Sequence, residues 1–221
     1  MCLPLLLEVL EMVRKSKEEA DKTYHALLDA ALDLFKERGV AQTALNDIAR
    51  AVAMTRGAVY WHFENKDDMV IALWQRDGQT VLDRLVADLK RPHLDDPLRA
   101  FQESVRSVVA LLSQNPRRAD VIRLTLSCQE FAERDTELQQ LLRRIMAELY
   151  DGIVCAMERP SNQGRLQAGL PVPLAAYAVW SSVLGMAQWR LPQNDAITLG
   201  DAAPVVVEMF LGAVLRQPDG G

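Results

Sequence analysis

The feature that most constrains this chain is the stretch from Leu45 to Lys66, which reads LNDIARAVAMTRGAVYWHFENK. Its first part predicts a short helix, because apolar residues recur there at helical spacing: Leu45, Ile48, Ala49 and Val52. Ala53 and Met54 interrupt the pattern. A second short helix is then predicted, with Thr55 as its N-cap, because a threonine hydroxyl can accept an otherwise unpaired backbone N–H.

The second predicted helix has two different faces. Val59 and Phe63 lie four residues apart and are expected to pack against the first helix. The opposite face carries Arg56, Gly57, Tyr60 and His62, with Lys66 just beyond. Arginine can bind the two acceptors of guanine or a phosphate, and tyrosine, histidine and lysine suit phosphate oxygens. Glycine permits close approach of backbone to DNA. This pattern predicts a helix-turn-helix, whose second helix enters the major groove.

The segment TRGAVYWHFENKDDM resembles the helix-turn-helix signature of the TetR family of bacterial repressors. The preceding RKSKEEADKTYHALLDAALDLFKERGVAQTALNDIA is similar to that family's basic lead-in, first helix and second helix. RKSKEEA, RGAVYWHF and WSSVLGMAQWRLP are most similar to the AcrR-like regulators of multidrug efflux pumps. The resemblance implies a DNA-binding domain followed by an effector-binding body, whose last two helices pair with those of a second subunit.

Composition bounds the class of protein. The chain has 221 residues, 49% of them hydrophobic, but no apolar stretch approaches the roughly 20 residues of a membrane span. The odd count of three cysteines, without metal-ligand spacing, predicts a reduced cytoplasmic protein whose thiols are small buried hydrophobes. No cofactor or metal is expected. Three histidines lie in separate segments, and neither a nucleophile elbow nor a phosphate-cradling glycine loop is present, which argues against an enzyme.

The net charge of −5 is unevenly distributed. Residues 12–66 hold nine Lys or Arg and eight Asp or Glu, a net charge of +1, so the remainder carries −6. The affinity for DNA is therefore expected to depend on where the charges lie and on the presence of two DNA-binding domains, rather than on attraction by the net charge of the protein.

The fold class expected is all-α, with about nine helices. Helical periodicity and breakers place the remaining helices at about residues 17–38, 66–89, 97–113, 117–127, 135–157, 174–190 and 201–216. The first of these has an expected buried stripe of Tyr24, Leu27, Leu28, Ala31, Leu34 and Phe35, and Gly39 is expected to be its C-cap. Residues 159–173 are expected to form a loop. Residues 12–66 should form the DNA-binding domain and residues 67–221 the ligand-binding and dimerisation domain. Residues 1–11 are interpreted as a non-native or upstream-start extension before Met12, with a genuine amphipathic extension as the alternative.

Three sets of site residues are predicted. DNA contacts are expected from Thr43, Thr55, Arg56, Gly57, Tyr60, Trp61, His62 and Lys66. The alternative for Thr43 is a cap on the first helix of the pair, and the resemblance implies that one hydroxyl can serve either purpose. Arg14, Lys15 and Lys17 form either a basic arm or a charged tail. Ligand contacts are expected from Phe101, Val105, Arg123, Leu126, Gln129, Trp180 and Gln188. Dimer contacts are expected from Tyr177, Ser181, Leu184, Gly185, Glu208, Met209 and Gly212.

These patterns predict a homodimeric transcriptional repressor that binds a near-palindromic double-stranded DNA operator. By the resemblance, the operator controls a multidrug efflux operon, and a small amphiphilic or aromatic effector releases the protein from DNA. The alternative is a DNA-binding regulator controlled by a protein partner, and a sizeable closed cavity in the body would distinguish the two.

Overall fold

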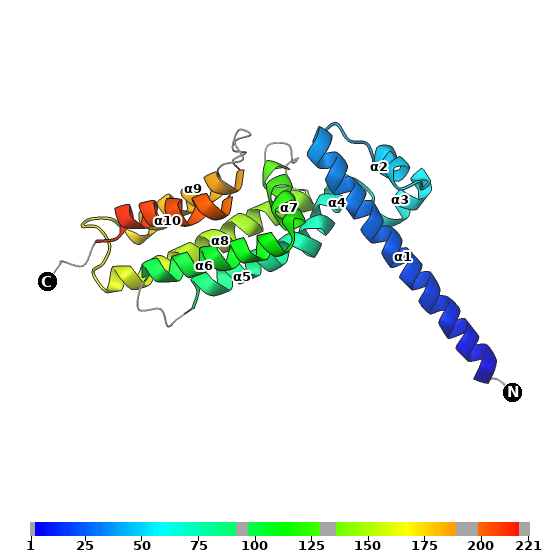
Figure 1. The fold of residues 1–221 in the computed structure, drawn as a ribbon, viewed down its shortest axis with the longest axis horizontal. Coiled ribbons are helices and arrows are strands. Elements are labelled where there is room, and N and C mark those ends of the chain that lie inside the picture. The colour runs from blue at the N-terminus through cyan, green and yellow to red at the C-terminus, as the bar shows by residue number, and fades with distance from the viewer. Residues whose placement is uncertain (1–2, 92–96, 129–135, 189–198, 217–221) are drawn as a thin grey trace. The chain divides into compact units, whose positions relative to one another are not determined.

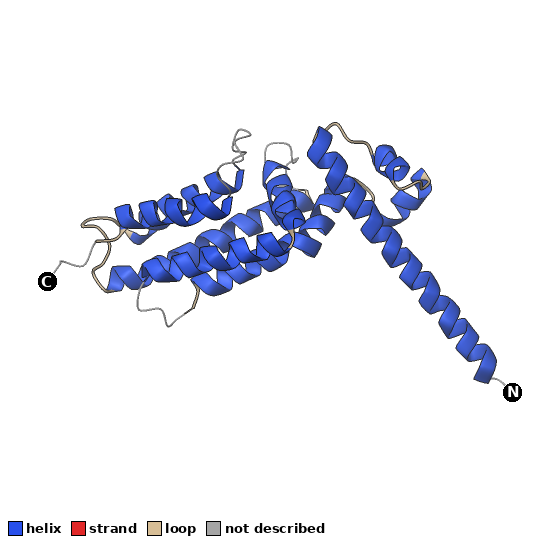
Figure 2. Cartoon of the chain, viewed as in Figure 1, coloured by secondary structure: helices blue, strands red, loops and turns tan. Residues whose placement is uncertain are grey.

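The computed structural model describes residues 3–91, 97–128, 136–188 and 199–216. These residues are almost entirely helical, and no β-strand occurs among them (Figure 2). An isolated antiparallel bridge joins Leu166 to Leu215. The all-α prediction is therefore confirmed for the described part of the chain.

Figure 1 labels the helices of the described residues. In chain order they are α1 (Leu3–Arg38), α2 (Leu45–Ala51), α3 (Arg56–His62), α4 (Lys66–Leu73), the π-helical turn η1 (Trp74–Gly78), α5 (Gln79–Leu89), α6 (Pro97–Gln114), α7 (Pro116–Ser127), α8 (Glu137–Asn162), α9 (Val172–Gln188) and α10 (Leu199–Val214). Because α4, η1 and α5 are continuous, the described residues form nine helical runs, the number expected.

The chain divides into two compact units between Leu73 and Trp74. In the first unit, α1 packs against α2 and α4, and α2 packs against α3. The predicted apolar stripe of α1 supplies fully buried side chains at Leu27, Leu28 and Ala31. Ile48 from α2 and Val59 from α3 complete this core, so the two short helices bury the faces that the sequence predicted.

Helix α1 begins earlier than expected and ends where expected. It starts at Leu3 rather than near Lys17, because the intervening LPLLLEVLEMVRKS has good helix formers and its proline lies in the first turn, where proline is tolerated. Its other end is closed by Gly39, which adopts a φ of 83° and donates its N–H to the carbonyl of Phe35 at 2.9 Å. The predicted glycine C-cap is confirmed.

The run from α4 to α5 contains a π-helical turn that the periodicity did not predict. Its Gly78 lies beneath the indole of Trp74: a Cβ added to Gly78 would come within 2.5 Å of Trp74 Cε3. The Trp74 indole N–H donates to Gln79 Oε1 at 2.9 Å. Glycine is needed here because the ring occupies the space of a side chain.

In the second unit, α8 packs against α5 and α9, α5 against α6, and α10 against α6 and α9 (Figure 1). Helix α8 continues to Asn162, through Pro160, so the loop expected from residue 159 begins later. The chain then turns through Gly164 and Gly169, which both have positive φ, before α9. Backbone bonds tie this turn to the end of α10, including Arg216 N–H to Arg165 O at 2.7 Å.

The cysteines only partly match expectation. Cys128 is buried as predicted, whereas Cys155 is exposed because it lies on the solvent face of α8. Cys2 lies outside the described residues. None of the described helices is long and apolar enough to span a membrane. Within the same ranges, no three His, Cys, Asp or Glu side chains gather where they could hold a metal ion.

Candidate nucleic-acid interface

The turn between α2 and α3 is a Schellman motif with an alanine at its left-handed position. Ala53 has a φ of 54° and donates to the carbonyl of Arg50 at 3.1 Å. Met54 donates to the carbonyl of Ala49 at 2.8 Å. These two bonds satisfy the last carbonyls of α2 and turn the chain sharply into α3.

Helix α3 starts as predicted. Thr55 has extended backbone angles, and its hydroxyl accepts from the Ala58 N–H at 3.3 Å. Gly57 follows on the exposed side, where an added Cβ would have one neighbour within 4 Å among the described residues, the Thr55 hydroxyl at 3.8 Å. The fold therefore does not itself require a glycine at this position.

One turn of α3 presents a paired arginine and tyrosine to solvent. The Arg56 guanidinium donates from Nη2 to the Tyr60 hydroxyl at 3.1 Å, and its Cζ lies 5.1 Å from the centre of the Tyr60 ring. Tyr60 is 45% exposed, and the neighbouring Trp61 is 74% exposed. Large aromatic side chains left in water on one short helix are typical of a surface that binds a partner.

His62 lies on the inner side of α3 rather than beside Arg56. Its ring is half-buried and lies 4.6 Å from the Trp61 ring and 5.9 Å from the Tyr24 ring of α1. Tyr24 also stacks on Phe63, with ring centres 5.1 Å apart. Burial lowers the pKa of His62 below its ordinary value of 6.5, because the charged form loses hydration. At neutral pH the imidazole therefore offers one N–H rather than a positive charge.

Lys66 binds the protein's own backbone. Its ammonium donates to the carbonyl of Val40 at 2.6 Å and to that of Ala41 at 3.1 Å. It thereby ties the start of α4 to the loop that precedes α2. An ammonium has three N–H donors, so one remains for a phosphate.

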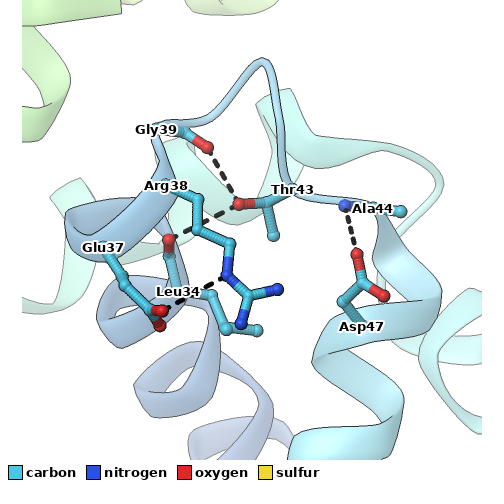
Figure 3. A network of polar contacts seen from close by, with 7 residues as sticks. All are labelled: Leu34, Glu37, Arg38, Gly39, Thr43, Ala44 and Asp47. Atoms are coloured by element: carbon cyan, nitrogen blue, oxygen red, sulfur yellow. Dashed lines mark hydrogen bonds and ion pairs between the residues drawn. The ribbon is translucent and has the colours of Figure 1, made fainter.

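The expectation that Thr43 caps α2 is wrong. Thr43 is only 1% exposed, and its hydroxyl donates to the carbonyl of Gly39 at 2.8 Å, with Leu34 O at 3.5 Å (Figure 3). The N-cap is Ala44, whose N–H donates to Asp47 Oδ2 at 3.2 Å. The hydroxyl is drawn inward because it can satisfy carbonyls at the end of α1, and α2 begins without a side-chain cap.

The expected basic arm is part of α1. Arg14 forms an exposed pair with Glu18 at 3.4 Å, and Lys17 is also exposed. The side chain of Lys15 lies outside the described set. Both described residues are thus held on a helix rather than in a loose tail.

Comparison with known proteins agrees with this geometry. Residues 27–73, which include α2, the turn and α3, match the family described as bacterial regulatory proteins of the tetR family. The chain is similar to the transcriptional regulator AcrR of Shigella flexneri, with 31% identity over 212 residues that cover 94% of this chain and 98% of that protein. The chain belongs to the TetR family. The resemblance predicted from the sequence is confirmed, and the protein is a transcriptional regulator.

Solved structures of other TetR regulators share the fold. NalD, described as the secondary repressor of the MexAB-OprM multidrug efflux pump in Pseudomonas aeruginosa, is 27% identical with a TM-score of 0.72, covering 90% of this chain and 98% of its own. SmeT in complex with triclosan is 26% identical with a TM-score of 0.70, covering 90% of this chain and 93% of its own.

The residues expected to line an effector site of this TetR protein differ from one another in burial. Leu126 is buried in α7 and Val105 is half-buried in α6. Arg123 is partly exposed and pairs with Asp120. Trp180 packs edge-on to Tyr150, with ring centres 6.4 Å apart, and its buried indole nitrogen has no hydrogen-bond partner within the described part of the chain. Gln129 and the side chains of Phe101 and Gln188 lie outside the described residues.

Most of the residues expected at the dimer interface are exposed on α9 and α10. Tyr177 is 56% exposed and Met209 is 69% exposed. Leu184 is half-buried, while Ser181 and Glu208 are exposed. A Cβ added to Gly185 or to Gly212 would meet no atom of the described residues within 4 Å.

Sequence reasoning missed three contacts of this site. The i,i+4 spacing of Arg56 and Tyr60 is the pattern that allows helical side chains to meet and could have revealed their pairing. The bonds of Lys66 to the loop before α2 and the stacking of Tyr24 on Phe63 join residues far apart in sequence, and no local pattern indicates them.

Proposed function

We propose that this protein is a homodimeric repressor that inserts α3 into the major groove of a near-palindromic operator. The observation that carries this proposal is the outer surface of α3, where Arg56, Tyr60 and Trp61 reach into solvent beside Gly57. Arginine reads guanine, and aromatic groups with polar edges suit the backbone on either side. Among the described residues, a Cβ at Gly57 would have a single neighbour within 4 Å, the Thr55 hydroxyl at 3.8 Å, which leaves room for DNA to approach the backbone.

Dimerisation would occur through α9 and α10. These two helices expose large apolar side chains that a monomer would leave in water, namely Leu174, Tyr177, Val205, Met209 and Phe210. Gly185 and Gly212 lie on the same two helices, and since no described atom lies within 4 Å of a Cβ at either position, they would let a second backbone approach closely. A two-fold dimer would set two copies of α3 about 34–36 Å apart, the distance between successive major grooves on one side of DNA.

Release from DNA would follow binding of a small aromatic or amphiphilic effector in the body. The complex of SmeT with triclosan supports this class of effector. A multidrug efflux operon as target is supported by NalD, which is described as a repressor of a multidrug efflux pump. The Trp180 indole N–H and the Thr125 hydroxyl are buried polar groups that find no hydrogen-bond partner among the residues that the structure describes. A ligand with a hydrogen-bond acceptor could satisfy such a group, since an unpaired buried donor is costly.

The test of the DNA-binding surface is Gly57→Leu, with Gln140→Leu on the exposed face of α8 as the control. Both positions are exposed, so both variants should fold with an unchanged circular dichroism spectrum. Operators are first selected from random double-stranded DNA with the unaltered protein. Gly57→Leu should then lose operator binding, while Gln140→Leu retains it. If Gly57→Leu bound the operator normally, DNA would have to contact a surface other than the one around Gly57, and this proposal would be wrong.

Triclosan provides the first probe of effector control. It should bind the purified protein, quench tryptophan fluorescence and lower operator affinity, and saturating operator should weaken triclosan binding by the same factor. Compounds that bind without changing operator affinity would contradict induction through the body.

A further inference from the structure

The strongest unexplained feature of the α3 surface is the double contact between Arg56 and Tyr60. One is a hydrogen bond from Nη2 to the phenol oxygen at 3.1 Å, and the other places the guanidinium carbon 5.1 Å from the ring centre. Both residues are exposed, so burial does not force them together. Their contact instead holds the arginine against a rigid ring that stands one helical turn further along α3.

An unrestrained arginine on an exposed helix samples many rotamers, and fixing it on DNA consumes part of the binding free energy. A guanidinium already held by a ring and a hydroxyl loses less freedom when it reaches a base. The geometry of α3 therefore reduces the ordering that base recognition requires.

The Tyr60 hydroxyl can also donate a hydrogen bond. Its oxygen accepts the N–H of Arg56, and its own hydrogen is a separate donor. A phosphate oxygen of the DNA backbone accepts such a hydrogen bond. The Tyr60 hydroxyl can thus bind both Arg56, which reads a base, and a phosphate of the DNA backbone.

We propose that Tyr60 is a positioning residue for Arg56: its ring and hydroxyl orient the guanidinium before DNA arrives, and the hydroxyl hydrogen then fixes that orientation to a backbone phosphate. This inference rests on the proposed DNA-binding function of α3. It makes Tyr60 a determinant of sequence discrimination rather than of affinity alone, although it touches no base.

The experiment compares Tyr60→Phe, which keeps the ring and removes the hydroxyl, with Trp61→Phe as the matched control. Arg56→Ala first identifies, by its loss of preference, the base pair that Arg56 reads in the selected operator. Tyr60→Phe should reduce discrimination at that base pair by about 2- to 10-fold, the effect of one hydrogen bond, and leave other base pairs unaffected. Trp61→Phe should change the affinity for all sequences alike.

A second measurement needs no DNA. In the free protein, ¹⁵N relaxation of the Arg56 Nε–H should report an ordered side chain that becomes mobile in Tyr60→Ala. Full discrimination by Tyr60→Phe together with an Arg56 side chain that is equally mobile with and without Tyr60 would overturn the inference and leave Tyr60 as a simple phosphate contact. If the unaltered protein selects no DNA sequence, the proposed function fails instead, and the relaxation result still tests the pairing.

Discussion

Lys66 donates a hydrogen bond from its ammonium to the carbonyl oxygen of Val40 at 2.6 Å, across 26 residues of chain. With the second bond to Ala41 at 3.1 Å, it holds the loop between α1 and α2 against the start of α4. A residue at the end of the helix-turn-helix signature thus stabilises the entry to that motif, in addition to any contact it makes with DNA.

Replacing Lys66 with Met should loosen α2. Hydrogen bonds from charged groups contribute about 1.5–3 kcal/mol, and the partial exposure of Lys66 reduces the expected loss to about 1–2 kcal/mol. Amide hydrogen exchange of Ile48 and Ala49 measures this local stability. Lys90→Met, at an exposed lysine after α5, should leave their protection unchanged, and equal protection in both variants would refute the structural role of Lys66.

Ala44→Ser should stabilise α2 by about 1 kcal/mol, because Ala44 occupies the N-cap without an acceptor for the first N–H groups. A serine oxygen could accept from Asp47 N–H while Asp47 continues to accept from residue 44, which completes a reciprocal cap. Ala51→Ser, at the exposed last residue of α2, provides the control and should give no gain. Thermal unfolding compares the two, and a serine at residue 44 that stabilises no more than one at residue 51 would contradict the assignment.

Ala53→Gly should also stabilise the protein, by about 0.5–1 kcal/mol. The left-handed φ of 54° costs an alanine about 1–2 kcal/mol, from which the greater freedom of glycine in the unfolded chain is subtracted. The same change at Ala51, which lies in α2, should destabilise by about 0.5–1 kcal/mol. In urea unfolding, the free energy of unfolding should rise for Ala53→Gly and fall for Ala51→Gly. A fall for both variants would contradict backbone strain at Ala53.

Gly78→Ala should destabilise the second unit by about 1–3 kcal/mol, since the new methyl would overlap the Trp74 ring. The indole would have to move and lose its bond to Gln79. Gly152→Ala is a matched helical control, because its added Cβ approaches Leu89 only to 3.4 Å. Thermal unfolding and near-ultraviolet circular dichroism should separate the two variants. If Gly78→Ala and Gly152→Ala were equally stable, the Trp74 ring would not be held over Gly78.

Stability should fall as the pH is lowered through about 6.5, owing to His62. Its pKa is lowered in the folded protein by burial, so the unfolded chain binds more protons in this range and protonation favours unfolding. The loss begins at the unfolded pKa of about 6.5 and levels off below the folded one. His62→Gln should flatten this part of the stability profile. An NMR titration that gives His62 a pKa at or above 6.5 would contradict the prediction.

Much of the site could be predicted because its signals are local. The cap at Thr55 and the left-handed Gly39 depend on residues within one helical turn, so sequence spacing reveals them. The apolar faces of α2 and α3 follow from periodicity, and Ile48 and Val59 are buried as expected. By contrast, Thr43 was assigned to the cap of α2 from its position alone, whereas the end of α1 supplies the carbonyls that its hydroxyl binds.

The sequence by itself determined the helical class, the two short helices and the division of α3 into a buried and a solvent-facing side, because helix periodicity and capping act over a few residues. Only the tertiary structure decided that Lys66 reaches Val40, that Tyr24 stacks on Phe63, and that Trp74 folds over Gly78 in a π-helical turn. The first two contacts join segments distant in sequence, and the third depends on which rotamer the surrounding helices allow. A hydrogen-bond donor or an aromatic ring takes whichever partner the packed chain brings within reach, and that partner has no fixed place in the sequence.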